Sequence, residues 1–439
     1  MVGTQVPRAA VAALIVAAAS SGAFAAGFTI NEHSASGIAT AFAGVAAAAD
    51  DASVIADNPA GIAFLAGPQL VLTGTFVDPH LPFTNSGSVL PSGAPLGGGN
   101  DDATTFAPLP NFFLAHPIDG QFTAGVGIFP SFGLATNYRP NWVGRYSAQS
   151  AELTSVDLAP TIAYRPLPNL AFGISPVARY TKVKIATAVD FGAIGAGAGI
   201  PGSVPGGADG STKLRASGWS FAFNGGVQFV PVEGTRLGFS YYHNDGAKLT
   251  GSGRFGRSTV GNVLAAATGA FTNSDISGIV GYPDHANVGI VHQVTPDLDV
   301  RGGLTWTQWS SFKEERIVFV NPAQSDALTN ENWHDNFNVA IGGTYRATPN
   351  LTLRAGLGYD ETPIPNAMRR NPRLPDASRF VTAVGFGYVI TPTTSIDFAY
   401  EHLFGGRVGI RATSATGDQL IGSTDLSADV FAVQLTVRY

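Results

Sequence analysis

The chain has 439 residues, of which 45% are hydrophobic and only 13% are charged, and its net charge is −6. Because an average soluble domain is about 25% charged, a soluble protein of this composition would struggle to cover its surface with polar groups. After the N-terminus no apolar run reaches about 18 residues, which excludes helical membrane spans. An apolar composition without such runs must alternate apolar and polar residues, as the wall of a membrane β-barrel does.

The first residues have the features of a secretory signal. Arg8 supplies a positive charge, Ala9–Ala19 is an apolar stretch too short to span a membrane, and Ala23–Ala25 has the small residues of a cleavage site. We therefore expect residues 1–25 to be a signal peptide and the protein to be exported. The absence of Cys excludes disulfides and thiolate metal sites, and the negative net charge argues against nucleic acid as a partner.

Residues 26–67 do not alternate. The Ala-rich stretch Ala41–Ala52 is compatible with a short helix, and Asn58-Pro59-Ala60 would break any helix that reached it, because Pro lacks a backbone donor and restricts the residue before it. This segment either lies in the periplasm or folds into the barrel as a plug. Its small-residue composition favours the plug, since a disordered tail would carry more charge.

From residue 68 onward, strands of alternating pattern are joined by short turns rich in Pro, Asn, Asp and Gly, which suit tight turns. Six such turns occur, at 116–120, 165–169, 231–234, 295–297, 348–350 and 391–393. They join twelve strands, and Gln69–Val77 and Ala428–Tyr439 bring the predicted total to fourteen, an even number as in bacterial single-chain barrels. The intervening segments 79–104, 131–151, 187–212, 251–284, 321–331, 361–378 and 411–427 are predicted to be the extracellular loops.

The last predicted strand places Phe431, Val433 and Leu435 on one face and Gln434 and Thr436 on the other. In a barrel the apolar face meets lipid and the small or polar face meets the lumen. The chain ends on Tyr439, an aromatic residue of the kind found at the end of many outer-membrane barrels. We expect this end to be read by the outer-membrane assembly machinery.

Several stretches in order along the mature chain resemble the FadL family of outer-membrane transporters for long-chain fatty acids and other hydrophobic compounds. They include Ala26-Gly27-Phe28, Ala49-Asp50-Asp51-Ala52, Asn58-Pro59-Ala60, Trp142–Tyr146, Trp306–Phe312 and Asp360–Pro365. The resemblance implies an all-β fold: a 14-stranded antiparallel transmembrane barrel over residues 68–439, with an N-terminal plug, or hatch, of short helices in the lumen over residues 26–67.

The resemblance also implies passive uptake of a hydrophobic ligand that leaves sideways through the barrel wall at a kink in the third strand. In this chain Pro130 interrupts that strand, and the opening would involve Phe129, Pro130, Phe132 and Gly133. Pro cannot donate to the ladder and should leave a gap or bulge. The alternative, of equal weight, is a strand that simply ends there.

By position in matching strands, Lys182 and Arg316 resemble the family's head-group residues, so we expect them to bind a carboxylate in the lumen. The alternative is that both are ordinary lumen or rim charges paired with acids such as Glu314. In the outer loops, Val263, Leu264 and Phe271 follow a helical spacing that could form an apolar groove for catching ligand. A loop helix packed on its neighbours is equally compatible.

The function predicted is passive transport of long-chain fatty acids or similar compounds across the bacterial outer membrane. The alternatives are an aromatic or alkane hydrocarbon channel of the same fold and, in a different class, a structural or adhesive barrel without transport. No catalytic residue, metal site or cofactor is expected, since the sequence has neither a metalloprotease nor a serine-hydrolase motif. The expected partners are the ligand, the lipid membrane and the assembly machinery, with no nucleic acid, and the protein is expected to be a monomer.

Overall fold

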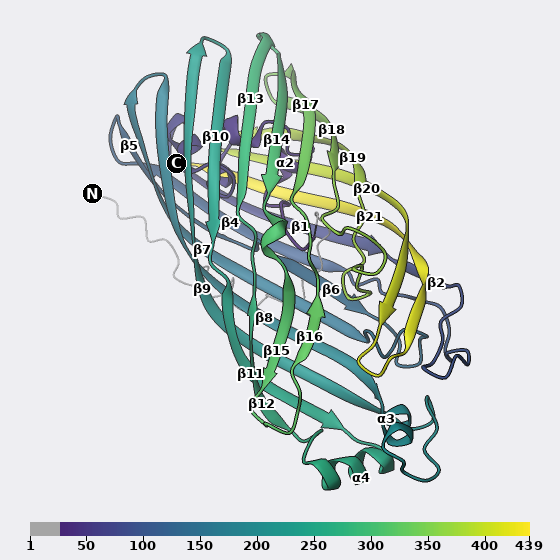
Figure 1. The fold of residues 1–439 in the computed structure, drawn as a ribbon. Helices are drawn as coiled ribbons and strands as arrows, with labels where there is room; N and C mark the ends of the chain where they lie inside the picture. The colour runs from purple at the N-terminus through teal and green to yellow at the C-terminus, as the bar shows by residue number, and fades with distance from the viewer. Residues whose placement is uncertain (1–26) are drawn as a thin grey trace.

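The computed structural model describes residues 27–439, so the predicted signal peptide lies outside the described residues. Within them, β-segments form one continuous antiparallel sheet that closes on itself, because the first segment pairs with the last (Figure 1). The seam runs from the pair Gln69 and Arg438 to the pair His80 and Ser427. A closed sheet leaves no unpaired edge facing lipid.

Several β-segments are two parts of one wall strand interrupted by a bend, and the wall has fourteen strands, as predicted. In chain order they are β1 with β2 (Gln69–His80, Pro82–Asn85), β3 with β4 (Asp101–Asp102, Ala107–Pro117), β5 with β6 (Phe122–Phe129, Gly133–Asn137), β7 (Ser150–Leu167), β8 (Leu170–Asp190), β9 (Asp209–Val232), β10 with β11 (Thr235–Asn244, Ala247–Gly256), β12 with β13 (Ser274–Val280, His285–Thr295), β14 with β15 (Leu298–Thr307, Glu314–Phe319), β16 with β17 (Ala327–Asn330, Asn336–Thr348), β18 (Leu351–Asp360), β19 (Arg379–Thr391), β20 (Thr394–Thr413) and β21 (Gln419–Arg438).

The six short turns predicted from Pro, Asn, Asp and Gly are confirmed, and each joins two neighbouring strands at the same end of the barrel. The predicted faces are also confirmed: on β21 Phe431 and Val433 are exposed, whereas Gln434 is fully buried on the lumen side. No helix among residues 27–439 is both long and apolar enough to cross a membrane.

The loop predicted at 361–378 is confirmed, but the other predicted outer loops are too long, because the strands continue into them. β8 runs to Asp190 and β9 begins at Asp209, inside the loop predicted at 187–212. The cause is that polar side chains replace apolar ones on the outward face beyond the membrane, while the backbone ladder goes on. The loops hold two short helices, α3 (Phe191–Gly197) and α4 (Thr259–Thr268), which lie together at the end of the barrel opposite the short turns (Figure 1).

The hatch fills the lumen with short turns of helix: α2 (Ala35–Ile38), η1 (Val45–Ala47), η2 (Ala52–Ile55) and η3 (Pro59–Phe64). These contact the inner faces of strands all round the barrel, since α2 meets β19 and β20, η1 meets β10 and β13, and η3 meets β7 and β8. The short helix expected in the Ala-rich stretch Ala41–Ala52 is the single 3-10 turn η1, and Ala52 begins η2. Ala41, Phe42 and Gly44 there take positive φ angles, which no α-helix allows.

Glycines on the lumen side of the wall let the hatch backbone come close. A Cβ atom at Gly238 would overlap the carbonyl oxygen of Ala46, and one at Gly173 would overlap the backbone of Pro59 and Ala60. Similar overlaps would occur at Gly356 against Thr40. Much of the high glycine content therefore serves the fit between wall and plug.

Candidate functional site

An outer pocket opens at the extracellular end of the barrel, with a volume of about 1030 Å³. One side of it is apolar and comes from lumen-facing side chains of β8, β9 and β15. Ile185, Leu214 and Phe319 are buried there as one cluster, and Ile317 packs against them. This surface can accommodate a hydrocarbon chain without direct contact to polar groups.

The opposite side of the outer pocket carries arginines. Arg369, Arg370 and Arg373 come from the segment between β18 and β19, and Arg411 comes from β20. Arg373 is paired with Glu315 at 3.0 Å, whereas Arg370 donates to the carbonyl oxygens of Asp376 and Gly409. Burial lowers the pKa of Arg370, although the charge of Asp376 opposes that effect. The guanidinium of Arg411 makes no hydrogen bond or ion pair within residues 27–439. The lining contains four arginines against two acids, Glu315 and Asp326, so the pocket has an apolar side and an excess of positive charge.

Below the outer pocket the lumen is closed by a cluster of aromatic rings around Phe28. The ring centroid of Phe28 lies 4.7 Å from that of Trp309, 5.6 Å from Phe312 and 6.2 Å from Trp333. Gly27 makes this fit possible, because it has φ +70° and a Cβ atom there would lie 2.5 Å from the Trp309 ring. We call residues 27–33 the leading segment of the hatch. The rings of Phe28, Trp309, Phe312 and Trp333 together form what we call the aromatic constriction.

The third wall strand is interrupted where the sequence predicted a break. β5 ends at Phe129 and β6 begins at Gly133, and both pair with β7. On the other side, the ladder between β4 and β5 covers only Phe112–Pro117, and no pairing joins β4 to β6 among the described residues. The outer part of β4 therefore pairs on one side only, which leaves a discontinuity in the wall at this point.

The leading segment fills the inner side of this break. Backbone hydrogen bonds join Ile30 N to Ser131 O at 2.8 Å and Gly133 N to Phe28 O at 2.9 Å. His33 Nε2 lies 3.0 Å from the carbonyl oxygen of Pro130. The segment thus takes the place of a strand partner for residues that the wall leaves unpaired, and Phe129 and Phe132 are both buried against it.

A smaller inner pocket of about 70 Å³ lies between the hatch and the wall, beside the break. Its lining includes His33, Phe129, Phe132 and Arg179. Arg179 is fully buried and forms a two-pronged ion pair with Asp157, with both bonds 2.7 Å long. Its guanidinium also lies 4.6 Å from the centre of the Phe132 ring.

The lumen cation beside the break is therefore Arg179, which the sequence analysis did not single out. The signal was present in the alternation: Arg179 and Thr181 share the lumen face, while Tyr180 and Lys182 share the outward face. Because Tyr180 is aromatic and faces outward, Arg179 and Thr181 on either side of it face the lumen.

The prediction that Lys182 and Arg316 lie in the lumen is wrong. Lys182 is exposed on the outward face of β8, next to Tyr180. Arg316 is exposed on β15 and pairs with Glu314 and Asp326, while its neighbours Glu315 and Ile317 face the outer pocket. The expectation rests on position in matching strands, where an error of one residue moves a side chain to the opposite face.

The three predicted groove residues on the outer loops do not share one surface. Leu264 is buried in the contact of α4 with its neighbours, whereas Val263 is exposed. Phe271 lies beyond the end of α4 and lines the outer pocket, where its ring is 5.1 Å from Phe191 and 5.9 Å from Phe255. Of the three, only Phe271 faces the space available to a ligand.

The rest of the hatch, residues 34–64, which we call the hatch body, is anchored by polar contacts as well as by the close glycines. Asn58 donates to the carbonyl oxygens of Ala46, Val227 and Phe239, and its own side-chain oxygen accepts from Ala60 N. Pro59 begins η3, where it needs no donor. The predicted break at Asn58-Pro59-Ala60 is thus the point at which the hatch body is tied to two wall strands.

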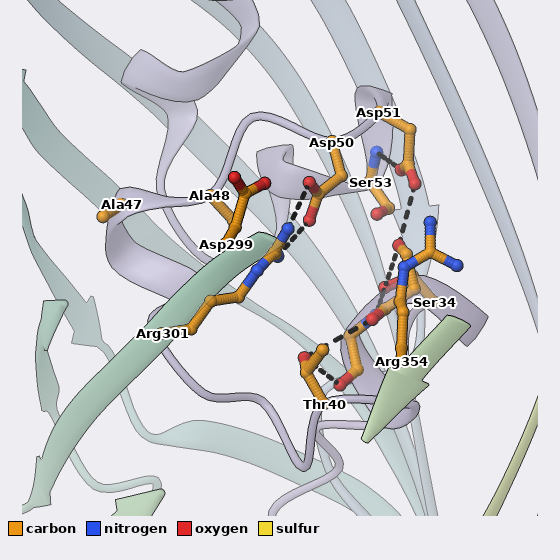
Figure 2. Close-up of polar contacts among 12 residues, drawn as sticks. Ser34, Thr40, Ala47, Ala48, Asp50, Asp51, Ser53, Asp299, Arg301 and Arg354 are labelled. Atoms are coloured by element: carbon orange, nitrogen blue, oxygen red, sulfur yellow. Dashed lines mark hydrogen bonds and ion pairs between the residues drawn. The ribbon is translucent and has the colours of Figure 1, made fainter. Parts of the chain in front are cut away.

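Ion pairs hold the hatch body on another side of the barrel. Figure 2 shows Asp50 turned toward Arg301 of β14. Two guanidinium nitrogens of Arg301 donate to the two carboxylate oxygens of Asp50, and the bond from Nη2 to Oδ1 is 2.8 Å long. Burial alone would raise the pKa of Asp50, but the charge and hydrogen bonds of Arg301, together with the charges of Arg354 and Arg236, hold it well below its usual range. Next to it Asp51 accepts from Ser53 N and from Gln434 of β21.

These features define a class: a transmembrane β-barrel with a plugged lumen, pockets on both sides of a constriction, and a break in its wall. A sequence profile described as "Outer membrane protein transport protein (OMPP1/FadL/TodX)" matches residues 16–439. The chain belongs to this family and is a protein of the bacterial outer membrane.

Its relatives agree with this assignment. The "Long-chain fatty acid transport protein" of Shigella flexneri is 29% identical over 422 residues, covering 91% of this chain and 92% of that protein. "Outer membrane protein P1" of Haemophilus influenzae is 27% identical, with 91% of each chain covered.

Solved structures show the same fold. The crystal structure of a Pseudomonas aeruginosa FadL homologue matches with a TM-score of 0.86 and 25% identity, covering 94% of this chain and all of that one. The Pseudomonas putida toluene transporter TodX matches with a TM-score of 0.69 and 18% identity, covering 91% and 98%. At that lower identity the likeness concerns the fold alone.

Proposed function

We propose that this protein carries long-chain fatty acids, or similar amphiphilic compounds, across the outer membrane by passive diffusion. The observation that supports the proposal is the outer pocket, which is lined by an apolar cluster on one side and by arginines on the other. A fatty acid needs both, because its chain gains from leaving water and its carboxylate gains from a guanidinium partner. A neutral hydrocarbon would need only the apolar wall.

The path proposed runs from the outer pocket to the break in the wall. The ligand enters among the outer loops, with Phe271 at the pocket and with Val263 and Leu264 on the helix that supports this rim. It then displaces Phe28 from the aromatic constriction and reaches the inner pocket. From there it leaves sideways past Phe129, Pro130, Phe132 and Gly133 into the membrane, so that it never crosses the hatch body.

Two other functions remain to be separated from this one. Uptake of aromatic or alkane hydrocarbons is the second candidate, because two proteins of the same fold, from Ralstonia pickettii and Pseudomonas putida, are toluene transporters. A structural or adhesive barrel would have no use for two pockets joined by a constriction. An enzymatic role has no support, since the named members of the family are transport proteins.

Uptake of radiolabelled oleate and of toluene by liposomes carrying the purified protein tests the proposal. Arg369→Gln with Arg411→Gln should reduce oleate uptake and leave toluene uptake unchanged, because only oleate has a charged head. Arg407→Gln is the matched control, since Arg407 is exposed on β20 away from the pocket. Uptake of toluene alone by the wild type would favour a hydrocarbon channel, and uptake of neither would overturn transport.

The remaining partners are also part of the proposal. Residues 1–25 are proposed to direct export and to be removed, and Tyr439 at the end of β21 is proposed to be read by the assembly machinery. Its ring is exposed on the outward face near the periplasmic end, where another protein could reach it. Because one chain closes the barrel and encloses the whole path, a monomer suffices for transport.

A further inference from the structure

The outward face of β8 and β9 changes from aromatic to basic side chains along the strands. Tyr180 and Trp219 stand side by side there, with ring centroids 5.2 Å apart, and both are exposed. Exposed aromatic rings of this kind mark the level at which a barrel passes from hydrocarbon to lipid head groups. Both strands continue beyond this level toward the extracellular end, so their next outward residues lie among the head groups.

Those next residues are basic. We call the set the basic wall patch; its members are Lys182, Lys184, Lys213, Arg215 and Arg254. The strand register places Lys184 opposite Arg215 and Lys213 opposite Arg254, so they lie on adjacent strands of the same face. Each alternates with a lumen-facing residue; Lys213 and Arg215, for example, flank the buried Leu214.

Most of this charge is uncompensated by the protein. Lys184 is paired with Glu152 at 2.8 Å. The other four cations form no ion pair within residues 27–439, and the only further acid among the residues that line this face is Asp275. Like charges on neighbouring strands repel, so such a cluster is most stable where an anion is close.

The patch surrounds a hollow and is not a flat surface. A depression of about 920 Å³ is lined by Lys182, Lys184 and Arg215. Hydroxyl groups of Thr154, Ser217, Thr250 and Ser252 complete the lining. Ammonium, guanidinium and hydroxyl donors around one hollow are the groups that bind phosphate oxygens.

The outward face of β20 and β21 is different. On β20 and β21, Tyr400 donates to Asp429 at 2.6 Å, and His402 Nδ1 lies 2.7 Å from the same carboxylate. That surface satisfies its own polar groups and contains no Lys or Arg in the cluster. The basic wall patch therefore has no counterpart in this cluster on β20 and β21.

We propose that the basic wall patch binds the phosphorylated head group of a glycolipid in the outer leaflet of the outer membrane. The acyl chains of this lipid lie against the apolar wall below Tyr180 and Trp219, and its phosphates enter the hollow between the cations. Basic residues at a membrane surface each strengthen binding to anionic lipid. The protein thus carries a lipid on its outer surface, separate from the transport path in its lumen.

Calorimetric titration of the detergent-solubilised full chain with bisphosphorylated lipid A in mixed micelles tests the proposal. The test variant is Lys182→Gln with Lys213→Gln and Arg215→Gln. Removal of three cations, at about fivefold each, should weaken binding on the order of 100-fold. The control is Arg139→Gln with Arg316→Gln and Arg407→Gln, which removes the same charge from exposed sites elsewhere and should leave the affinity unchanged.

Two further probes identify what is bound. Dephosphorylated lipid A should bind as weakly to the wild type as the intact lipid binds to the test variant. Competition by millimolar inorganic phosphate would show a site for a free anion and would overturn a lipid site, as would equal losses in the test and control variants. A heat-dependent gel shift checks that each barrel is folded, and oleate uptake should be the same in all of them.

Discussion

The two parts of the hatch are held in different ways. The hatch body touches the wall backbone to backbone at glycines, and it adds buried hydrogen bonds and ion pairs such as that of Asp50 with Arg301. The leading segment is held by backbone hydrogen bonds at the wall break, by side-chain hydrogen bonds from His33 to the carbonyl oxygen of Pro130 and from Thr75 to that of Glu32, and by the packing of Phe28. The wall therefore fixes the part that blocks the lumen and holds less firmly the part beside the ligand path. A ligand needs to displace only the second part.

The largest effect is expected from Arg301→Met, which leaves Asp50 without its partner. Because breaking a buried ion pair costs about 3–5 kcal/mol and Asp50 is partly accessible, we expect a loss of about 2–4 kcal/mol in the free energy of unfolding. Urea unfolding followed by gel mobility measures it. An unchanged midpoint would mean that the ion pair does not anchor the hatch body.

This loss should depend on pH in a defined direction. The pKa of Asp50 is lower in the folded protein than its ordinary value of 3.8. The ion pair therefore contributes fully above about pH 5, and its contribution falls progressively as the pH is lowered further. The difference in unfolding midpoint between wild type and Arg301→Met should thus be constant from pH 5 to pH 7 and shrink in more acidic buffer.

The next largest effect concerns the close approach of wall and hatch body. At Gly238→Ala the new Cβ would overlap the carbonyl oxygen of Ala46, so the hatch body must shift, at a cost of about 1–3 kcal/mol. Gly302→Ala is the control, because its Cβ meets nothing closer than 3.6 Å on the outward face. Equal stability of the two variants would contradict the tight fit.

A moderate effect on transport, with a smaller one on stability, is expected from Phe28→Ala in the leading segment. Removing this ring opens the aromatic constriction, and oleate uptake should rise by a few-fold if entry through the constriction limits the rate. The unfolding midpoint should fall less than in Gly238→Ala. Slower oleate uptake together with a large fall in the unfolding midpoint would show that both parts of the hatch are equally needed for the fold.

The smallest effect is expected from Lys182→Ala with Arg316→Ala. Both side chains lie on the outward face and neither reaches the path beside the hatch, so oleate affinity should stay within about twofold of the wild type. A fluorescence-displacement assay measures it. A strong loss of oleate affinity would show that these two residues belong to the ligand site and that the path proposed through the lumen is incomplete.

The sequence was sufficient for the wall because its information there is local. Pro, Asn and Gly predict the turns, and alternation such as that around Gln434 indicates which side of the wall each residue faces. The hatch is different: its short helices are shaped by contacts with distant strands, such as Ala46 with Gly238, which leave no local pattern. The alternation shows that Arg179 faces the lumen, but its role depends on the neighbours that the fold brings to it, namely Asp157 and Phe132.

The seam of the barrel also bears on the order of assembly. Gln434 of the final strand accepts a hydrogen bond from Thr73 of the first strand and one from the hatch backbone at Ala35, and donates to Asp51. The last strand thus meets the first strand and the plug at a single side chain. Because the hatch precedes β1 in the chain, it is already present when β21 arrives. The plug can therefore act as an internal template for closure, rather than as a part inserted into a finished barrel.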